Sequence, residues 1–173
     1  MDSMYTLVSE NNPVLQEYMP EANLSEIEDL KPVAERMLET MRMHEGIGLA
    51  APQVGLTLRM FVMLAGDEEM ICINPSFEPL RAGQIEEVGL IDSQEGCLSY
   101  PKLYLKVKRH KEIKASYFDL NGQKVETILN GLPSRCFQHE LDHLNGITFT
   151  AKVSKLVLSL AKKRRAKLQR KGK

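Results

Sequence analysis

Apolar side chains recur at helical intervals near the start of the chain and predict the first helix. These positions are Val33, Met37, Leu38 and Met41. A Ser-x-x-Glu capping box, SEIE at 25–28, precedes them and is typical of a helix N-terminus. We therefore expect a helix from about Ser25, which Pro32 either kinks or divides, and which ends near Gly46.

Shorter apolar runs follow, and their length and composition predict strands. Two runs are typical of short buried strands, RMFVML (59–64) and MICI (70–73). A β-hairpin is predicted over 112–129, EIKASYFDLNGQKVETIL, because Asn121-Gly122 stands between two β-prone runs. This dipeptide is a strong signal for a type I′ turn.

The hydrophobic pattern returns to helical spacing in the last third of the chain. One helix is predicted from about Leu132 to Leu144, with Gly146 ending it. A second, amphipathic helix is predicted from about residue 153, with an apolar stripe that is expected to dock on the rest of the protein. The stripe consists of Val153, Leu156, Val157 and Leu160. The order of helix, several strands, helix and helix predicts an α+β fold rather than alternating βαβ units.

The composition is that of a globular protein with one domain, spanning 1–173. Hydrophobic residues make up 43% and charged residues 27%, and 173 residues are enough to bury a real core. The chain has no apolar run of about 18 residues and no basic and apolar leader, so neither a membrane span nor a signal peptide is expected. Its three cysteines are an odd number at no paired spacing, so a cytoplasmic, reducing location is expected.

Charge is distributed unevenly, although the net charge is zero. All 23 acidic residues and 13 of the 23 basic residues lie in 1–150, which gives that part a net charge of −10. The other ten basic residues lie in 151–173 without an acid, so 152–173 is predicted to form a basic C-terminal helix. The helix dipole alone favours such an end, but ten positive charges also make a patch that could contact phosphates.

The segment QHELDHLNG (138–146) contains two of the four histidines. On a helix, His139 and His143 face the same side, so both imidazoles can reach one metal ion. Glu140 lies about 100° around the helix, where it can reach a water on that metal without being a ligand. This is the H-E-x-x-H arrangement of metal-dependent hydrolases, although so short a motif also occurs by accident. Asp142 either orients one imidazole or is a solvated carboxylate.

A catalytic metal needs a third protein ligand, and the cysteines are the candidates. Cys136 precedes His143 by seven residues, roughly 10.5 Å along the helix axis, so a buried packing role is favoured. Cys72 lies in an apolar strand and is expected in the core. Cys97 stands in the glycine-containing segment QEGCLSYP (94–101) and, taken with the histidine pair, is the best third ligand.

The glycine-rich stretch GIGLAAPQVG (46–55) would let the backbone approach a bound molecule, or it is a structural loop after the first helix. It lacks the Gly-Lys-Ser/Thr ending of a phosphate loop and the glycine spacing of a dinucleotide fingerprint. Gln53, held beside Pro52, could donate a hydrogen bond from its amide into a site.

Three of these stretches resemble the signatures of the peptide deformylase family. The signatures are G-φ-G-L-A-A-P-Q, with φ apolar, E-G-C-L-S and Q-H-E-x-D-H-L, and they stand here in order at 46–53, 95–99 and 138–144. The resemblance implies mostly antiparallel β-sheets packed around a metal-binding H-E-x-x-H helix. It also implies an enzyme that removes the N-formyl group from the N-terminal formyl-methionine of newly made polypeptides, releasing formate.

Carried over by position, the resemblance also implies roles for individual residues. The implied metal ligands are Cys97, His139 and His143. The implied catalytic groups are Glu140 as general acid and base, with Gln53 and the Leu98 backbone N–H as oxyanion donors. The implied substrate-pairing backbone is that of Ile47, Gly48 and Gly96. The metal in the family is typically Fe2+, with Ni2+, Co2+ or Zn2+ as substitutes.

The implied partners are nascent formyl-methionine peptides and, through the basic C-terminal helix, the ribosome surface, as in some deformylases that this chain resembles. No DNA and no membrane partner is expected. The chain departs from some family members at Tyr104, where they carry a substrate-binding arginine. Arg109 is a candidate for that role.

Two other functions are weighed against this one. A zinc endopeptidase shares H-E-x-x-H but usually takes its third ligand from a downstream glutamate or histidine, and neither follows His143. A non-catalytic ribosome-binding or RNA-binding module would use the basic tail. The intact set of candidate ligands, together with Glu140, argues against a site that has lost catalysis.

Overall fold

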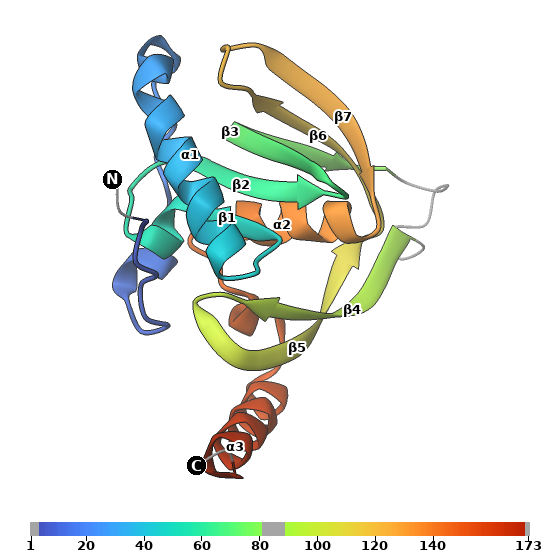
Figure 1. Cartoon of the computed structure of the whole chain (residues 1–173). Helices are drawn as coiled ribbons and strands as arrows, with labels where there is room; N and C mark the ends of the chain where they lie inside the picture. Colours follow the sequence, from blue (N-terminus) through green and yellow to red (C-terminus); the bar gives the residue numbers. More distant parts are fainter. Residues whose placement is uncertain (1–3, 81–88, 172–173) are drawn as a thin grey trace.

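Two antiparallel β-sheets and three α-helices form the part of the chain that this computed structural model describes, residues 4–80 and 89–171 (Figure 1). The strands are β1 (Gly48–Ala50), β2 (Met60–Ala65), β3 (Glu68–Pro79), β4 (Leu90–Cys97), β5 (Tyr100–His110), β6 (Glu112–Phe118) and β7 (Lys124–Asn130). The α-helices are α1 (Ile27–Met43), α2 (Leu132–Leu144) and α3 (Lys155–Lys171). All pairings between these strands are antiparallel, so the predicted α+β class with antiparallel sheets is confirmed.

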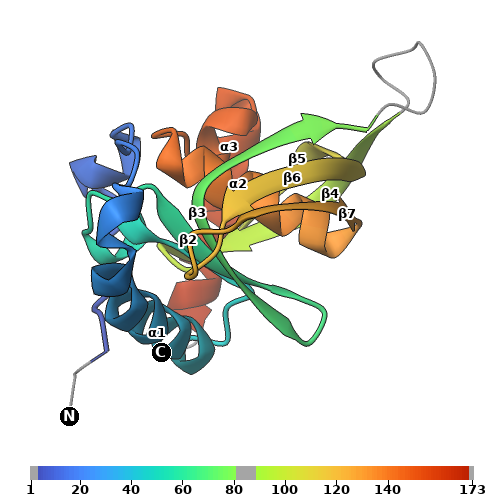
Figure 2. The same cartoon turned by 90° about the horizontal axis from the view of Figure 1, so that it is seen from above.

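Five strands form one sheet in the order β1-β2-β3-β6-β7, and β4 and β5 form a separate hairpin. Side chains of β2 alternate between the two faces of the large sheet, because successive residues of a strand point in opposite directions. Phe61 and Met63 belong to the core on the α2 side, while Met60 and Val62 belong to the core on the α1 side. Figure 2 shows α1 and α2 on the two sides of the large sheet. Because α2 also contacts β5, it lies between the large sheet and the hairpin.

The first helix differs from its prediction at its start. A short 3-10 turn (Leu24–Glu26) precedes α1, which begins at Ile27 rather than near residue 25. The cap is Asn23, whose side-chain oxygen accepts a hydrogen bond from Ser25 N at 3.1 Å, in place of the predicted capping box. Pro32 lies inside the helix and does not divide it.

The hairpin of β6 and β7 is confirmed, but its turn is not the predicted type. A type I′ turn needs positive φ at both central residues, and φ is positive at Gly122 (72°) but not at Asn121. The carboxylate of Asp119 instead accepts hydrogen bonds from the backbone N–H groups of Asn121 and Gln123. These bonds stabilise a longer loop, 119–123, between the strands.

The end of α2 is held by a buried arginine that precedes β2. Arg59 donates hydrogen bonds to the carbonyl oxygens of Leu144 (3.2 Å) and Met19 (3.4 Å) and to the side-chain oxygen of Asn145 (2.9 Å). A cation at a helix C-terminus also interacts favourably with the helix dipole. The last turn of α2, which carries His143, is therefore tied to the large sheet.

Helix α3 docks with a different face from the one predicted. Of the predicted stripe only Val153 packs against the core around β5, where Leu158 and Ala161 join it. The other members, Leu156, Val157 and Leu160, are 69%, 45% and 44% exposed. Arg165 extends the docked face, because it pairs with Glu10 at 2.6 Å. Neither α3 nor any other helix among the described residues has the length and apolar character needed to cross a membrane.

Candidate metal centre

Helix α2 brings three titratable side chains into the interior. It occupies Leu132–Leu144, as predicted from the hydrophobic spacing. His139 and His143 lie one turn apart, with their ring centroids separated by 5.0 Å. Both rings and Glu140 are at most 8% exposed. Burial of this kind is uncommon for a carboxylate, and it marks a special environment.

Cys97 meets the two histidines from the end of β4. The turn into β5 directs its Sγ toward α2, where it lies 3.4 Å from His143 Nε2. One ligand atom from each of Cys97, His139 and His143 lies within 4.8 Å of the others, so this group could hold a metal ion. Cys72 and Cys136 lie outside the group and are buried in the core, as the sequence predicts.

The donor set fits one divalent transition-metal ion. His139 Nδ1 is 2.9 Å from a carboxylate oxygen of Glu95, which leaves Nε2 available as a ligand. His143 Nδ1 and Glu140 Oε2 are buried and have no hydrogen-bond partner among the described residues. One thiolate and two imidazoles form a ligand set that suits iron, cobalt, nickel or zinc.

Glu95, rather than Asp142, is the carboxylate that orients an imidazole. Arg109 donates two hydrogen bonds to Glu95, at 2.8 and 3.0 Å, and one to Asp142 at 2.5 Å. Arg109 is 3% exposed and does not line the pocket described below. It is therefore an interior ion-pair partner, and its candidate role in substrate binding is corrected. Burial would raise the pKa of Glu95, but hydrogen bonds from His139 and Arg109 lower that pKa to about 2.

Glu140 lies against the backbone of Gly48, where no space remains for a side chain. A Cβ atom added at Gly48 would overlap the Glu140 carboxylate and would also press on Cys136 Sγ. Burial raises the pKa of Glu140 to about 7, although the nearby charge of His139 opposes the shift. A carboxyl group with such a pKa can take up and release a proton near neutral pH.

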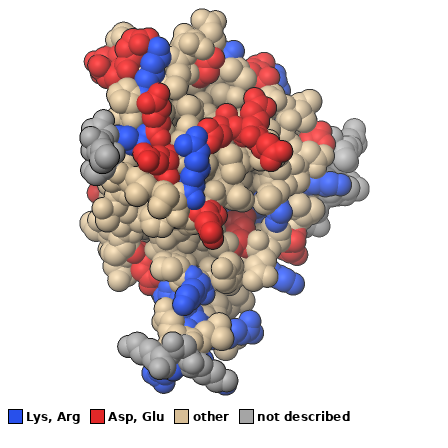
Figure 3. Space-filling view, in the orientation of Figure 1, with Lys and Arg blue, Asp and Glu red and all other residues tan. Residues whose placement is uncertain are grey.

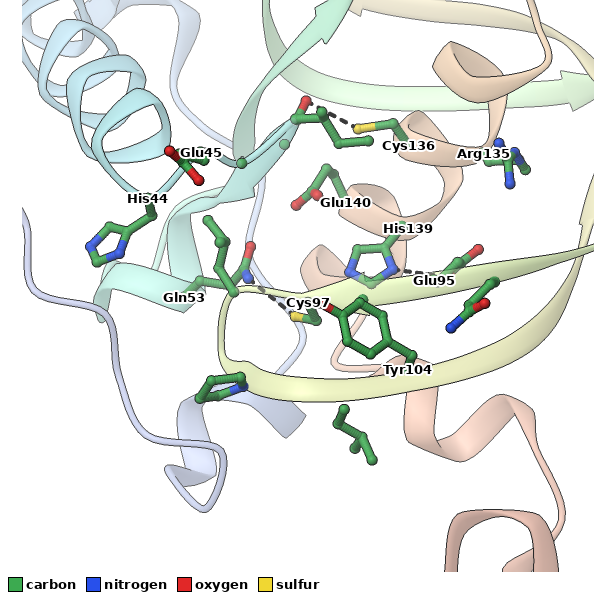
Figure 4. A pocket seen from close by; sticks show the side chains of 18 of the residues that line it. His44, Glu45, Gln53, Glu95, Cys97, Tyr104, Arg135, Cys136, His139 and Glu140 are labelled. Carbon is green, nitrogen blue, oxygen red and sulfur yellow. Dashed lines mark hydrogen bonds and ion pairs between the residues drawn. The ribbon is translucent and has the colours of Figure 1, made fainter. Parts of the chain in front are cut away.

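A pocket of about 570 Å³ opens beside the Cys/His/His group (Figure 4). Eight of the nine site residues implied by the resemblance line it, and His143 is the exception. Gln53 is held by Ala50 N, which donates to its Oε1 at 2.8 Å. Its Nε2 donates toward Cys97 Sγ at 3.4 Å and Ser99 Oγ at 3.3 Å. The sequence reasoning missed further lining residues that no motif marks, among them His44, Glu45, Leu132 and Arg135.

An α+β protein that brings a cysteine and two histidines together beside a buried carboxyl group has the features of the class of metal-dependent hydrolases. A family model described as Polypeptide deformylase matches residues 4–158. The chain therefore belongs to the polypeptide deformylase family. As a member it is a hydrolase that removes the N-formyl group from newly made polypeptides, so neither the endopeptidase nor the non-catalytic function is retained.

Individual relatives agree with this membership. The peptide deformylase of Thermotoga neapolitana is 43% identical over 137 residues, which cover 79% of this chain and 80% of that protein. A crystal structure of a peptide deformylase from Synechococcus elongatus in complex with actinonin is 37% identical, with a TM-score of 0.83 over 94% of this chain and 86% of that one. The peptide deformylase structure from Thermus thermophilus is 36% identical, with a TM-score of 0.81 over 96% of both chains.

Proposed function

We propose that this chain deformylates the N-terminal formyl-methionine of nascent peptides at the Cys97, His139 and His143 group. The approach of these three ligand atoms to within 4.8 Å, beside buried Glu140, supports the proposal most strongly. The three residues hold one divalent metal ion, with Fe2+ as the expected ion and Ni2+, Co2+ or Zn2+ as substitutes. Helix α2 is then the metal-binding helix between the sheets. Nascent peptides as substrates imply a cytoplasmic location.

A divalent metal bound there supplies Lewis acidity, which polarises a carbonyl group and lowers the pKa of water. The chain contributes the geometry that this chemistry needs. Glu95 fixes the ring of His139 through Nδ1, and Arg109 holds Glu95 in turn. Since all three side chains are almost fully buried, the imidazole of His139 has little freedom to rotate away.

Glu140 moves the proton during hydrolysis. Its Oε2 has no partner among the described residues, so it is available to accept a proton from the attacking water. The same carboxyl group returns the proton to the amine when the C–N bond breaks and formate leaves. A carboxyl group that serves both steps needs a pKa near neutrality, and burial supplies that shift.

Gln53 and the backbone N–H of Leu98 stabilise the negative charge that develops on the formyl oxygen. The Gln53 amide is oriented before substrate binds, because Ala50 N–H fixes its oxygen and leaves its nitrogen beside Cys97. Leu98 directly follows Cys97, so its N–H lies next to the same group. One donor of this kind is commonly worth roughly 3 kcal/mol in the transition state.

The substrate backbone pairs between the edge of the large sheet and the hairpin. Strand β1 is an edge strand, and the carbonyl of Ile47 just before it accepts a hydrogen bond from Leu64 N at 2.9 Å. Successive peptide groups of a strand point to opposite edges, so the groups of Gly48 face away from β2. Gly96 lies across the pocket near the end of β4. An extended peptide can therefore add as a strand between them.

A formyl-Met-Ala-Ser peptide assay tests the proposal directly. Purified protein should release formate under anaerobic conditions, which protect the Cys97 thiolate from oxidation. It should leave the acetyl-Met-Ala-Ser peptide and all internal peptide bonds intact. Absence of formate release by metal-loaded protein, or cleavage of an internal bond, would contradict the proposed function.

The contact between Gly48 and Glu140 gives a further prediction. Gly48→Ala should lower kcat on the formyl peptide at least tenfold, because the new methyl group displaces the Glu140 carboxylate and small misplacements of a catalytic group are costly. Gly89→Ala is the matched control, since a Cβ there meets nothing closer than 3.8 Å. Both variants should be assayed beside their thermal melting curves. A Gly48→Ala enzyme with native kcat would show that this close approach is unimportant.

We also propose that the basic face of α3 binds the ribosome. Cationic side chains gather at the end of the molecule formed by α3, while acidic ones lie over the opposite part (Figure 3). Lys163, Lys167 and Arg170 are exposed, whereas Arg165 is engaged with Glu10. Exposed cations of this kind bind phosphates by displacing counterions, and ribosomal RNA carries such phosphates.

Neutralising these charges tests ribosome binding and keeps the ion pair between Arg165 and Glu10. Deletion of 162–173 would remove that ion pair. The triple variant Lys163→Ala, Lys167→Ala and Arg170→Ala should reduce co-sedimentation with ribosomes several-fold, and wild-type binding should fall steeply with salt. Activity on the short formyl peptide should stay unchanged. A control triple variant at Lys31, Lys114 and Lys124 removes equal charge from the body. Binding that survives the first variant or ignores salt would contradict this proposal.

A further inference from the structure

A second cleft lies beside the active-site pocket, between the β4–β5 hairpin and α3. Its volume is about 690 Å³. The helix wall contains Val157 and Leu160, two members of the predicted stripe that do not dock on the core. The hairpin wall contains the exposed side chain of Tyr104 from β5. Two of the three exposed apolar residues of the predicted stripe, Val157 and Leu160, therefore line a groove.

The cleft and the pocket share two lining residues. Gln94 and Tyr104 line both hollows. The ring of Tyr104 lies against Gly96, since a Cβ at Gly96 would come within 3.0 Å of the Tyr104 ring. Because Gly96 is also the proposed point of backbone pairing, a peptide that passes over Tyr104 would leave the pocket on the side of the cleft.

The cleft is cationic in a protein whose body is acidic. Four cationic side chains line it against one carboxylate, Asp92; the cations are Lys106, Lys108, Lys152 and Arg164. Lys152 is paired with Asp142 at 3.2 Å. Within 4–80 and 89–171, no ion pair engages Lys106, Lys108 or Arg164. Three cations are thus available to a bound molecule.

We propose that this cleft receives the substrate segment downstream of the formyl-methionine end and favours acidic side chains in it. The proposal rests on the proposed function, because it uses the position of the substrate in the pocket. An extended chain advances about 3.3 Å per residue, so a peptide of roughly ten residues is long enough to leave the pocket and enter the cleft. Carboxylates would pair with Lys106 and Lys108, and apolar side chains would pack on Tyr104, Val157 and Leu160.

RNA is the other polymer that such cations would attract. The border that the cleft shares with the pocket favours the peptide, because a nascent chain must leave the pocket along some path and Gln94 and Tyr104 line both hollows. The apolar residues between the cations also match a peptide, whose side chains vary, better than a phosphate backbone of uniform charge.

Three ten-residue formyl-Met peptides test the cleft. They share their first three residues and carry acidic, neutral or basic side chains at positions 4–10, and formyl-Met-Ala-Ser is the short reference. At low salt, kcat/KM should be about tenfold higher for the acidic than for the basic peptide, the scale of a few exposed ion pairs. The ratio should approach one at about 0.5 M salt.

Two double variants make the test specific. Lys106→Ala with Lys108→Ala should reduce the acidic-to-basic ratio at least twofold and leave kcat/KM for the short reference unchanged. Lys162→Ala with Lys163→Ala removes the same charge from a different side of α3 and should preserve the ratio. Melting curves of both variants show whether either change disturbs the fold.

Several outcomes would overturn the proposal. One is equal kcat/KM for the three long peptides, and another is the same loss of the acidic-to-basic ratio in both double variants. A third is that the Lys106 and Lys108 variant lowers kcat/KM for the short reference as much as for the long acidic peptide. If that variant weakened ribosome co-sedimentation and left the ratio intact, the cleft would be an RNA site. Failure of wild type to turn over the short reference would instead contradict the proposed function itself. Turnover of the short reference, with no charge preference among the long peptides, would overturn only the proposal about the cleft.

Discussion

Replacing Cys97 by alanine should reduce bound metal from about one ion per chain to a small fraction of that value. The substitution removes the sulfur that lies 3.4 Å from His143 Nε2 and leaves two imidazoles, which are too few protein ligands for a stable catalytic site. Deformylation should fall by more than about 100-fold, since even changes to residues that only orient metal ligands cost roughly 10- to 100-fold. The measurement is elemental analysis of purified protein together with kcat/KM on the formyl peptide.

Cys136→Ala is the matched control for this experiment. Cys136 is on α2 and lines the same pocket, but its Sγ donates to the carbonyl of Ile47 at 3.3 Å rather than joining the ligand group. Metal content should therefore stay near one ion per chain, even if the lost packing of the sulfur atom lowers stability slightly. Equal metal loss from both variants, or loss from Cys136→Ala alone, would refute the ligand assignment.

Glu140→Gln should separate proton transfer from metal binding. The amide has nearly the shape of the carboxyl group but cannot take up a proton, so kcat should fall by about 100-fold or more, as is usual for a general acid–base group. Metal content should remain unchanged because Glu140 does not belong to the ligand group. The measurement is kcat at saturating formyl peptide, with metal analysis on the same sample.

An exposed carboxylate on the pocket rim provides the control for the Glu140 variant. Glu45→Gln removes the same charge from the same pocket, but Glu45 is exposed and belongs to the turn after α1. Its effect on kcat should be at most a few-fold. Near-native kcat in the Glu140→Gln enzyme, or loss of its metal, would end the proposed role of this residue.

Local sequence patterns predict those helices and strands that are specified by neighbouring residues in the chain. The bounds of α2 follow from its apolar period and the glycine beyond it, and the β6–β7 hairpin follows from β-prone runs around a turn signal. The sequence of strand β5 also carries the alternation typical of a strand, since Leu103, Leu105 and Val107 are buried between exposed neighbours. Strand β4 lacks such a signal, because Glu95 faces inward to serve Arg109 and His139.

Interactions between distant segments explain what the sequence reasoning missed. The E-G-C-L-S motif contains Glu95, but its role depends on partners that β5 and α2 bring to it. Arg109 lies near the substrate-binding position in sequence, yet its position in β5 places its side chain in the interior. On α3, helical spacing identifies two apolar faces, and only the shape of β5 decides which one is buried. The three signature stretches are each contiguous in the sequence, so they can be recognised without knowledge of the fold.

The proposed ligands come from two elements that are far apart in the sequence. Cys97 ends β4, and His143 lies 46 residues later on α2. A metal ion between them would act as a cross-link that fastens the hairpin to the helix, as a disulfide fastens distant segments of a secreted protein. Such a link survives in a reducing compartment, where disulfides do not persist. It would also make tight metal uptake a late step of folding, since the complete ligand set forms only after the β4–β5 hairpin has docked on α2.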